Sequence, residues 1–430
     1  MRSTAEDVGA FCHALATRLF PICRSITGNG VRQTLSILEE HLPRLQVHEV
    51  ASGSAAFDWT VPAEWNIDEA YIEDEQGRRI VDFATSNLHV VGYSVPVDEW
   101  IELEDLQLRL HSLPEQPEAI PYVTSYYSPY WGFCLSQEAR GSLAPGRYHA
   151  VIRSALAPGS LTYGELFLPG REDEEVLIST YVCHPSLANN ELSGPAVVTA
   201  LAQWLMEKDR RYSYRFVFVP ETIGSIVYLS RNLEHLKSKV IAGFNVTCVG
   251  DERAYSYLPS RAGNALSDVA AKHALKHLVG DFVEYSWLDR GSDERQYCAP
   301  GVDLPVCSIM RSKYGEYPEY HTSLDDLSLI TPNGLGGAYE VLKAAIEAIE
   351  INVRPRVTVL CEPQLGKRGL YPNLGTKETQ AKVAAMMDLI SYSDGQRTLL
   401  EIAELINHPI WELDRILQPL RAAGLIKIDG

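Results

Sequence analysis

The feature of this sequence that most restricts its fold is a regular alternation of strand-like and helix-like segments after residue 174. Short apolar runs rich in β-branched and aromatic residues predict strands, and stretches with apolar residues three or four positions apart predict helices. The expected strands are residues 175–182, 214–220, 240–249 and 304–310, and the expected helices are 194–208, 224–236, 265–278 and 335–351. Strands separated by helices need crossover connections, so we expect an α/β fold with a mostly parallel sheet flanked by helices.

The first 50 residues predict two helices and a strand that belong to the same domain. Ser3 or Thr4 can cap the first helix, and the second covers residues 31–42 with its leucines at helical spacing. A short strand is expected at residues 45–50. The main domain therefore begins near the N-terminus and resumes farther along the chain.

Two other regions have a different composition. Residues 51–157 contain short apolar runs, frequent turn residues and many Trp, Tyr and Pro residues, which predicts a small inserted β-rich domain. Residues 356–430 carry two helical patterns followed by a strand, an order typical of a winged-helix domain. We therefore expect a main domain made of residues 1–50 and 158–355, interrupted by the insertion and followed by the winged helix.

The net charge argues against two classes of partner, and the cysteines indicate the compartment. The formal net charge of -18 repels both nucleic acid and anionic lipid, and no apolar run approaches the length of a membrane span. The eight cysteines form no C-x-x-C pair, and the N-terminus lacks the pattern of a signal peptide. Buried free thiols favour a reducing compartment, so we expect a cytoplasmic protein.

The residues that can carry chemistry follow the predicted strands. In open α/β sheets, ligands bind at the carboxyl ends of the strands. The polar residues at those positions are His184, Asn190, Glu191, Glu221, Asp251, Asp293, Glu294, Arg295, Tyr320 and His321. A mixture of imidazoles and carboxylates suits zinc, which accepts nitrogen and oxygen ligands and keeps one position open in catalytic sites.

Five of these segments, taken in order, resemble a known superfamily. They are His184, the loop Asn190-Glu-Leu-Ser-Gly194, the strand that ends in Glu221, Ser292-Asp293, and Tyr320-His-Thr-x-x-Asp325. The sequence resembles the co-catalytic zinc aminopeptidases, a superfamily that also holds glutaminyl cyclases and glutamate carboxypeptidases. It is most similar to a bacterial branch of aminopeptidase-like proteins encoded near polysaccharide or natural-product biosynthesis genes. That similarity includes residues 361–371 and the winged-helix tail.

The resemblance implies a role for each matching residue. His184 matches the first metal-binding histidine and His321 the last one. Glu221 matches the general base that takes a proton from the metal-activated water, and Asp293 matches an acidic residue that borders the site. These roles are what the resemblance implies, and they require the four residues to lie close together in the fold.

The sequence also departs from the superfamily at three metal-binding positions. Asn190 stands where a carboxylate bridges two zinc ions, Thr222 replaces a glutamate ligand, and Thr247 replaces an aspartate ligand. An amide and two hydroxyls are poor groups for holding two dications close together. We therefore expect one zinc ion at most, with Glu191 and Asp251 as candidate substitute ligands.

Each candidate residue also has a plainer structural interpretation. His184 precedes a proline and can belong to a turn, and Glu221 can act only as a favourable charge at a helix N-terminus. The segment 321–326 also reads as a helix cap. The aromatic run 122–133 is either the core of the β-rich insertion or a wall over the site. These alternatives remain open on the sequence alone.

We expect hydrolysis of an amide or peptide bond next to a free amine in a small peptide or aminoacyl-type substrate. Asp293 or Glu294 is the expected anchor for the amine, Arg295 binds a carboxylate or the oxyanion, and Tyr320 contributes to the substrate site. The first alternative is a non-catalytic binding or scaffold protein with a degraded metal site. The second is a DNA-binding regulator, but the tail after Arg397 has no basic excess. Packing or dimerisation, giving a homo-oligomer, is therefore the better expectation for the winged helix.

Overall fold

The computed structural model describes residues 4–370 and 377–429, which form two compact units. The first unit contains the chain up to residue 265 and residues 283–340, and the second contains residues 266–282 and the chain from residue 341 onward. Ser3 and Tyr371, named in the sequence analysis, lie outside the described residues. The first unit holds a large mixed sheet flanked by helices, so the predicted α/β class is confirmed.

The main sheet has eight strands, and its central strands run parallel. Their order across the sheet is β1-β10-β12-β11-β13-β16-β14-β15. Strands β12, β11, β13 and β16 run parallel, β10 is antiparallel to both β1 and β12, and β14 is antiparallel to β16 but parallel to β15. The strands are β1 (Gln46–Ala51), β10 (Ser160–Leu168), β11 (Glu175–Tyr181), β12 (Ser213–Val219), β13 (Val240–Asn245), β14 (Ser256–Leu258), β15 (Val283–Glu284) and β16 (Val306–Met310). The sequence analysis missed β10, β14 and β15.

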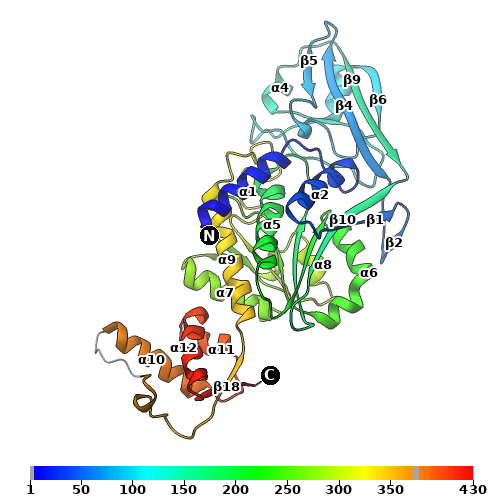
Figure 1. The fold of residues 1–430 in the computed structure, drawn as a ribbon. Coiled ribbons are helices and arrows are strands. Elements are labelled where there is room, and N and C mark those ends of the chain that lie inside the picture. The colour runs from blue at the N-terminus through cyan, green and yellow to red at the C-terminus, as the bar shows by residue number, and fades with distance from the viewer. Residues whose placement is uncertain (1–3, 371–376, 430) are drawn as a thin grey trace. The chain divides into compact units, whose positions relative to one another are not determined.

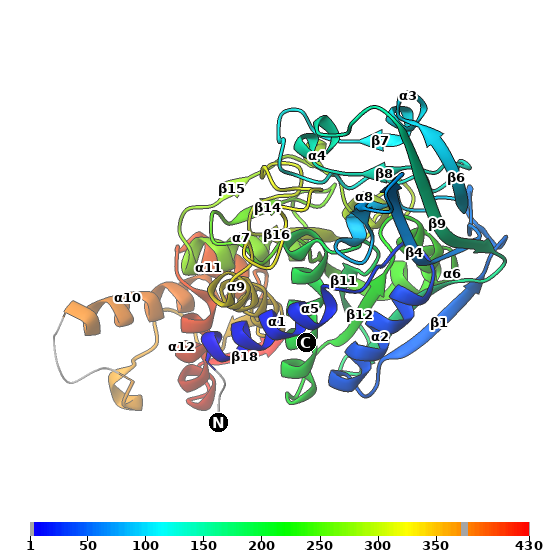
Figure 2. The same cartoon turned by 90° about the horizontal axis from the view of Figure 1, so that it is seen from above.

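Helices cover both faces of this sheet (Figures 1 and 2). One face carries α1 (Ala5–Leu19), α2 (Asn29–His41) and α5 (Ser193–Met206), and the other carries α6 (Ile223–Lys239) and α8 (Glu294–Tyr297). Thr4 caps α1 through a capping box with Asp7, as its sequence predicts. The chain runs from β11 through α5 to β12, and then through α6 to β13 on the other side of β11. The carboxyl end of β11 is therefore the point where ligands are expected to bind.

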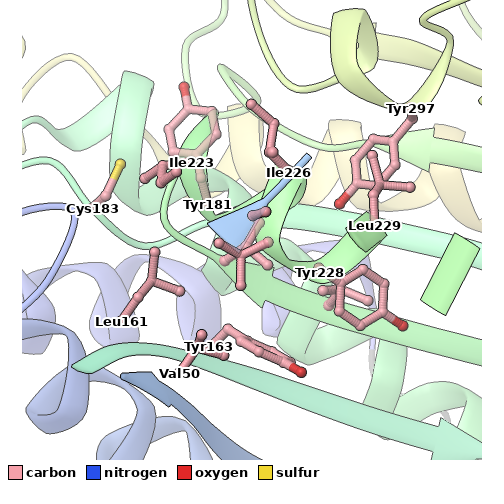
Figure 3. Packing of buried hydrophobic residues seen from close by; sticks show 14 of the residues in the cluster. Val50, Leu161, Tyr163, Tyr181, Cys183, Ile223, Ile226, Tyr228, Leu229 and Tyr297 are labelled. Atoms are coloured by element: carbon pink, nitrogen blue, oxygen red, sulfur yellow. The ribbon is translucent and has the colours of Figure 1, made fainter. Parts of the chain in front are cut away.

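The core between the sheet and α6 fixes the positions of these strand ends. Every residue of β11 is buried, as expected for a central strand covered on both faces, and its sequence carries the apolar run Val176–Ile178. Figure 3 shows Tyr181 of β11, Leu161 and Tyr163 of β10, and Ile223 and Ile226 of α6 packed in one cluster. The first turn of α6 is thus anchored next to the end of β11.

The inserted segment builds a separate antiparallel sheet, as its composition predicts. The sheet order is β5-β4-β9-β6, and a buried cluster that contains Ile72, Phe133 and Ile152 lies against it. Its strands are β4 (Glu64–Asp74), β5 (Arg79–Asp82), β6 (Val97–Glu102) and β9 (Arg147–Ala157). Smaller elements are the hairpin β2 (Ala55–Ala56) and β3 (Trp59–Thr60), the pair β7 (Leu110–His111) and β8 (Phe133–Cys134), and the helices α3 (Leu103–Leu106) and α4 (Gln137–Gly141).

The second unit contains the predicted helix–helix–strand order of a winged helix. Its elements are α7 (Leu266–Leu278), the end of α9 (Pro332–Glu350), β17 (Arg354–Val357), α10 (Lys377–Tyr392), α11 (Leu399–Leu405), α12 (Ile410–Ala422) and β18 (Ile426–Asp429). Here the structure differs from the predicted boundaries, because α7 packs with this unit.

A histidine joins α7 to the two helices of the winged helix. The His273 ring bonds through Nδ1 to Glu404 Oε1 at 2.5 Å and accepts the Ile410 amide through Nε2 at 2.9 Å. The imidazole therefore caps α12, whose own N-cap residue makes no side-chain hydrogen bond. Both ring nitrogens are engaged, so we assign no metal to this histidine although His277 lies one turn away. None of the helices in the described ranges has the length and apolarity needed to span a membrane.

The ion pair between Arg32 of α2 and Glu64 of β4 gives a testable acid dependence. Glu64 also accepts the Ser160 amide at 2.9 Å, and these bonds lower the pKa of Glu64 to about 2. A carboxylate with a lowered pKa stabilises the fold above its unfolded pKa of about 4.5, and this contribution is lost as the pH falls toward 2. Glu64→Gln should therefore cost about 1–2 kcal/mol at pH 7 and much less at pH 2.

The measurement is thermal unfolding of both proteins at several pH values between 2 and 7. Glu40→Gln is the matched control, because Glu40 pairs with Arg18 on the exposed surface. Its substitution should lower the unfolding midpoint less than Glu64→Gln does. If both substitutions shift the unfolding midpoint equally at every pH, the stabilising role of the Arg32–Glu64 ion pair is contradicted.

Candidate metal centre

His184 lies at the carboxyl end of β11, and one side of its ring is closed by a buried ion pair. Its Nδ1 atom is 3.0 Å from Glu191 Oε2, and Glu191 Oε1 lies 3.4 Å from Arg24 Nε. Arg24 also donates to the carbonyl oxygens of His184 and Pro185. Because the Nδ1 side is occupied in this way, the Nε2 atom is the one that faces the site. It lies 3.6 Å from Oε2 of Glu221.

Glu221 lies at the end of β12 and is held by a strained turn. Thr222 has φ 65° and ψ -77°, and the Ile223 amide donates to the Glu221 carbonyl at 2.8 Å, which defines a γ-turn of the rare strained kind. A β-branched residue with positive φ is an outlier that persists only where its surroundings enforce it. Asp293 Oδ1 accepts the Thr222 amide at 2.7 Å and enforces it here. Ser292 donates to Glu221 Oε1 at 2.9 Å and orients the carboxylate.

His321 meets His184 across the site. The centroids of the two rings are 5.4 Å apart, and His321 also has a positive φ of 57°. The main chain of the inserted domain holds this conformation, because the Tyr122 amide donates to the His321 carbonyl at 2.8 Å. The Tyr122 ring contacts both imidazoles at about 5 Å, and Tyr320 stacks on His321 at 3.9 Å. Two histidines 137 positions apart in the sequence therefore share one pocket.

Burial sets the charge state of these groups. The pKa of His184 falls to about 3 through burial and the nearby Arg24 charge, and burial together with His184 lowers the pKa of His321 to about 3. Both imidazoles are therefore neutral and have a lone pair for a cation. Burial raises the pKa of Glu221 to about 8, with Asp293 adding to the shift, and burial raises the pKa of Asp293 to about 7. A divalent cation between them would favour both carboxylates in their ionised form.

His184, His321 and Glu221 are the candidate ligands of a single zinc-sized ion on the Nε2 side of His184, although no three such donor atoms of the described residues lie within 4.8 Å of one another there, so these side chains would have to move closer to bind it. Two imidazoles on one tetrahedral zinc have ring centroids roughly 5 Å apart, close to the 5.4 Å observed. Within the described part of the chain, His321 Nε2 and Asp293 Oδ2 are buried without a hydrogen-bond partner. Buried polar atoms without partners are rare and point to an ion, a water or a ligand at that place.

The opposite side of His184 is unsuited to a cation. Donor atoms of Cys183, His184 and Glu191 come within 4.8 Å of one another there. The Arg24 guanidinium already supplies a positive charge to Glu191, and burial raises the pKa of Cys183 well above its usual value, so the thiol stays protonated. Glu191 therefore serves better as the outer carboxylate that fixes the tautomer of His184 than as a direct ligand.

A neutral hydrogen-bond network occupies the positions where the superfamily carries further ligands. Asn190 Nδ2 donates to the Tyr181 hydroxyl at 2.7 Å, and that hydroxyl lies 2.5 Å from Thr247 Oγ1. Thr247 in turn donates to the Asn190 carbonyl at 3.1 Å. These groups bond to one another and add no negative charge for a second dication, while Asn190 Oδ1 is buried without a hydrogen-bond partner among the described residues. The geometry therefore fits one ion better than two.

Two predicted site residues lie apart from this cluster. Asp251 accepts bonds from the amide and hydroxyl of Ser312 and from Asn189 Nδ2 and the Arg253 amide, so its carboxylate holds a loop. We therefore withdraw Asp251 from the ligand set.

The Glu294 carboxylate is equally engaged. It accepts the Gly291 and Ser292 amides, the Tyr314 hydroxyl and Asn245 Nδ2, which leaves it no role as an amine anchor. The structure brings together the remaining candidates: His184, Glu191, Glu221, Asp293, Arg295, Tyr320 and His321.

Three residues that shape the site were given no role from the sequence: Arg24, Cys183 and Ser292. Arg24 had one available signal, a lone charge between the apolar residues Ile22 and Ile26, which marks a cation that must find a buried partner. Cys183 Sγ accepts the Glu221 amide at 3.2 Å and so links the two strand ends. No sequence pattern identifies that contact.

Comparisons with known proteins identify the family of this chain. A family model described as "Domain of unknown function (DUF4910)" matches residues 13–352, and a winged helix-turn-helix model matches residues 353–428. The chain belongs to the DUF4910 family. A curated relative from Clostridium acetobutylicum is 44% identical over 405 residues, covering 93% of this chain and 92% of the relative. It is called "Putative polysaccharide biosynthesis protein with aminopeptidase-like domain".

Solved structures extend the similarity to zinc peptidases. A crystal structure of a Clostridium acetobutylicum protein called "putative peptidase" aligns with TM-score 0.94 and 42% identity over 99% of this chain and 97% of that one. A zinc aminopeptidase from Bacillus subtilis aligns with TM-score 0.59 and 12% identity over 79% and 94% of the two chains. A peptidase M28 precursor from Shewanella amazonensis aligns with TM-score 0.57 and 13% identity over 84% and 97%. The aminopeptidase-like fold predicted for this DUF4910 chain is confirmed.

The ligand assignment can be tested by metal analysis of three variants. His184→Ala and His321→Ala should each lose zinc after dialysis against buffer, because each removes one of only two imidazoles. Asp251→Asn should keep its zinc but lose about 1–3 kcal/mol of stability, because it perturbs a buried network. Zinc content by mass spectrometry and thermal unfolding midpoints are the measurements. Zinc retained by both histidine variants would contradict the assignment.

Proposed function

We propose that this DUF4910 chain is a single-zinc hydrolase that cleaves an amide or peptide bond next to a free amine. The observation that carries the proposal is the convergence of His184, His321 and Glu221 at the end of β11. The imidazole centroids are 5.4 Å apart, and Glu221 Oε2 lies 3.6 Å from His184 Nε2. When bound by the two histidines, zinc would polarise the substrate carbonyl and make a water molecule more acidic.

Glu221 is the residue that we assign as general base. Its carboxylate is held by the Ser292 hydroxyl and by the strained turn at Thr222, so it cannot swing away from the imidazoles. Its side chain is partly open to solvent, with 20% of it exposed. A carboxylate in this position can take a proton from water and deliver it to the leaving nitrogen.

Two other groups are assigned to substrate binding. Asp293 is buried, and its Oδ2 atom has no partner in the described chain, which suits an ammonium group. Arg295 donates to Thr222 Oγ1 at 2.6 Å, while its buried Nε has no hydrogen-bond partner within the same residues. We assign Asp293 to the substrate amine and Arg295 to a carboxylate or the oxyanion. Tyr320 contributes a wall through its stacking on His321.

We also propose a reducing compartment, the cytoplasm, as the site of action. All eight cysteines are free thiols, and six of them are buried. For the winged helix we propose packing or dimerisation, with no nucleic-acid partner, because its helices carry no basic excess.

A non-catalytic binding protein is the second candidate function. The neutral network of Tyr181, Asn190 and Thr247 favours it, because it shows that carboxylates can be absent without loss of packing. A protein of this kind would hold no stoichiometric zinc and would not hydrolyse aminoacyl substrates.

Glu221→Gln tests the catalytic assignment. It should lower kcat on an aminoacyl p-nitroanilide by about 10²- to 10⁴-fold while zinc content stays unchanged, because the amide keeps the shape but cannot accept the proton. Glu234→Gln is the matched control, since Glu234 is an exposed residue of α6, the helix that follows Glu221, and should not affect the rate. Activity that survives in Glu221→Gln would exclude Glu221 as the base.

A further inference from the structure

Three exposed aromatic side chains lie together on the inserted segment and the adjoining hairpin. Phe57 and Tyr127 are each 57% exposed, and Trp59 is 38% exposed. The rings of Trp59 and Tyr127 lie 5.8 Å apart in a T-shaped arrangement. Large aromatic side chains are usually buried, and an exposed group of them marks a binding surface. We call Phe57, Trp59 and Tyr127 the outer aromatic patch.

The conformation of Phe57 adds an independent observation. Phe57 and Asp58 form the two-residue loop between β2 and β3, and Phe57 has φ 53°. Hairpins of this kind favour glycine where φ is positive, and a bulky side chain there is strongly disfavoured. Burial of the Phe57 side chain does not offset this strain, because more than half of the side chain is exposed. Strain that is retained at an exposed site is typical of a functional position.

A continuous series of aromatic contacts connects the outer aromatic patch to the candidate metal centre. Tyr127 contacts Tyr126 with ring centroids 6.5 Å apart, and the hydroxyls of Tyr126 and Tyr122 are 2.7 Å apart. The Tyr122 ring in turn contacts His184 and His321. The patch thus lies at the outer end of a wall whose inner end covers the two imidazoles.

The hairpin also approaches the site from the side of Glu221. Ala56 of β2 is buried in the cluster that contains Ile223 and Ile226, the first residues of α6 (Figure 3). Ile223 follows Glu221 by two positions and makes the γ-turn bond to its carbonyl. Two independent sets of contacts therefore connect the patch to the candidate metal centre, one through Tyr126 and Tyr122 and the other through Ala56 and the first turn of α6.

The chemistry of the patch defines the kind of ligand it fits. Exposed rings bind flat apolar surfaces by stacking. The hairpin from Ala55 to Thr60 has one charged side chain, Asp58, and this charge disfavours an anionic ligand. A flat, apolar and uncharged face is found on an aryl side chain of a peptide and on the C–H face of a sugar ring.

We propose that the outer aromatic patch is a substrate subsite that binds a flat apolar group beyond the bond cleaved at the metal centre. This inference rests on the proposed function and narrows its substrate class. Single aminoacyl groups would occupy only the inner site, and substrates extended by an aryl residue or a sugar ring would use both.

The test measures equilibrium binding to the full chain that carries Glu221→Gln, so that no probe is turned over. The probes are the peptides Ala-Ala-Ala-Phe and Ala-Ala-Ala-Ala and the sugar cellotetraose, each titrated by calorimetry. In this background, Trp59→Ala and Tyr127→Ala should each weaken binding of the flat-faced probe roughly three- to tenfold and leave tetra-alanine unchanged. Preferential binding of the phenylalanyl peptide or of cellotetraose identifies the source of the flat face.

Two further variants separate binding from structure. Phe57→Gly should raise or preserve the unfolding midpoint, because glycine relieves the positive φ, and should weaken binding of the flat-faced probe. A purely structural role for Phe57 would instead lower the midpoint. Trp100→Ala is the matched control, because Trp100 is 44% exposed on β6 and stacks on His149, outside the patch.

The outcomes distinguish this subsite from the proposed function. If no flat-faced probe binds, or if all patch variants bind like Trp100→Ala, the subsite is excluded whatever the enzyme does. If the patch variants weaken binding but the protein holds no zinc and hydrolyses nothing, the subsite stands and the hydrolase proposal fails. If zinc and hydrolysis are both found while the patch variants bind the probes unchanged, the hydrolase proposal stands and the subsite is excluded.

Discussion

The site depends on the buried contact between Arg24, Glu191 and His184. Two ionisable groups removed from water are costly unless they pair, and here the guanidinium and the carboxylate lie 3.4 Å apart with no side-chain exposure. Glu191 Oε2 is thereby held 3.0 Å from Nδ1 of His184. Burial raises the pKa of Glu191 to about 8 against the opposing effect of Arg24, and in its ionised state Glu191 accepts a hydrogen bond from Nδ1, which leaves the lone pair on Nε2. The direction in which the imidazole can bind a cation follows from this one arrangement.

The remaining parts of the site are held by backbone strain and by the inserted domain. Thr222 and His321 both have positive φ values, and both lie beside groups that enforce them, Asp293 in one case and Tyr122 in the other. Because the Tyr122 amide bonds to the His321 carbonyl, the inserted domain is a structural part of the candidate centre. Both roles that the sequence left open for residues 122–133 are found, since Tyr122 lies against the two imidazoles and Phe133 lies in the core of the insertion.

The sequence was sufficient to predict the positions at strand ends. His184, Glu221 and His321 could be found because parallel strands must place their carboxyl ends at one edge, and the resemblance supplied their order. Asp251 and Glu294 show where such reasoning fails. Both are acidic residues in the segments that follow strands. Their carboxylates already accept hydrogen bonds from backbone amides and hydroxyls, and only the folded chain brings these donors near. Arg24 was missed for the same reason, since its partner lies 167 positions away.

X-ray absorption spectroscopy of the zinc-loaded protein tests the central claim most directly. The account predicts one zinc per chain, bound by two imidazole nitrogens and otherwise by oxygen, with no sulfur ligand. A zinc–sulfur distance near 2.3 Å would place the ion with Cys183 on the Nδ1 side of His184 and would contradict the account. A spectrum with a single imidazole would contradict it equally, because His184 and His321 would then not share the ion.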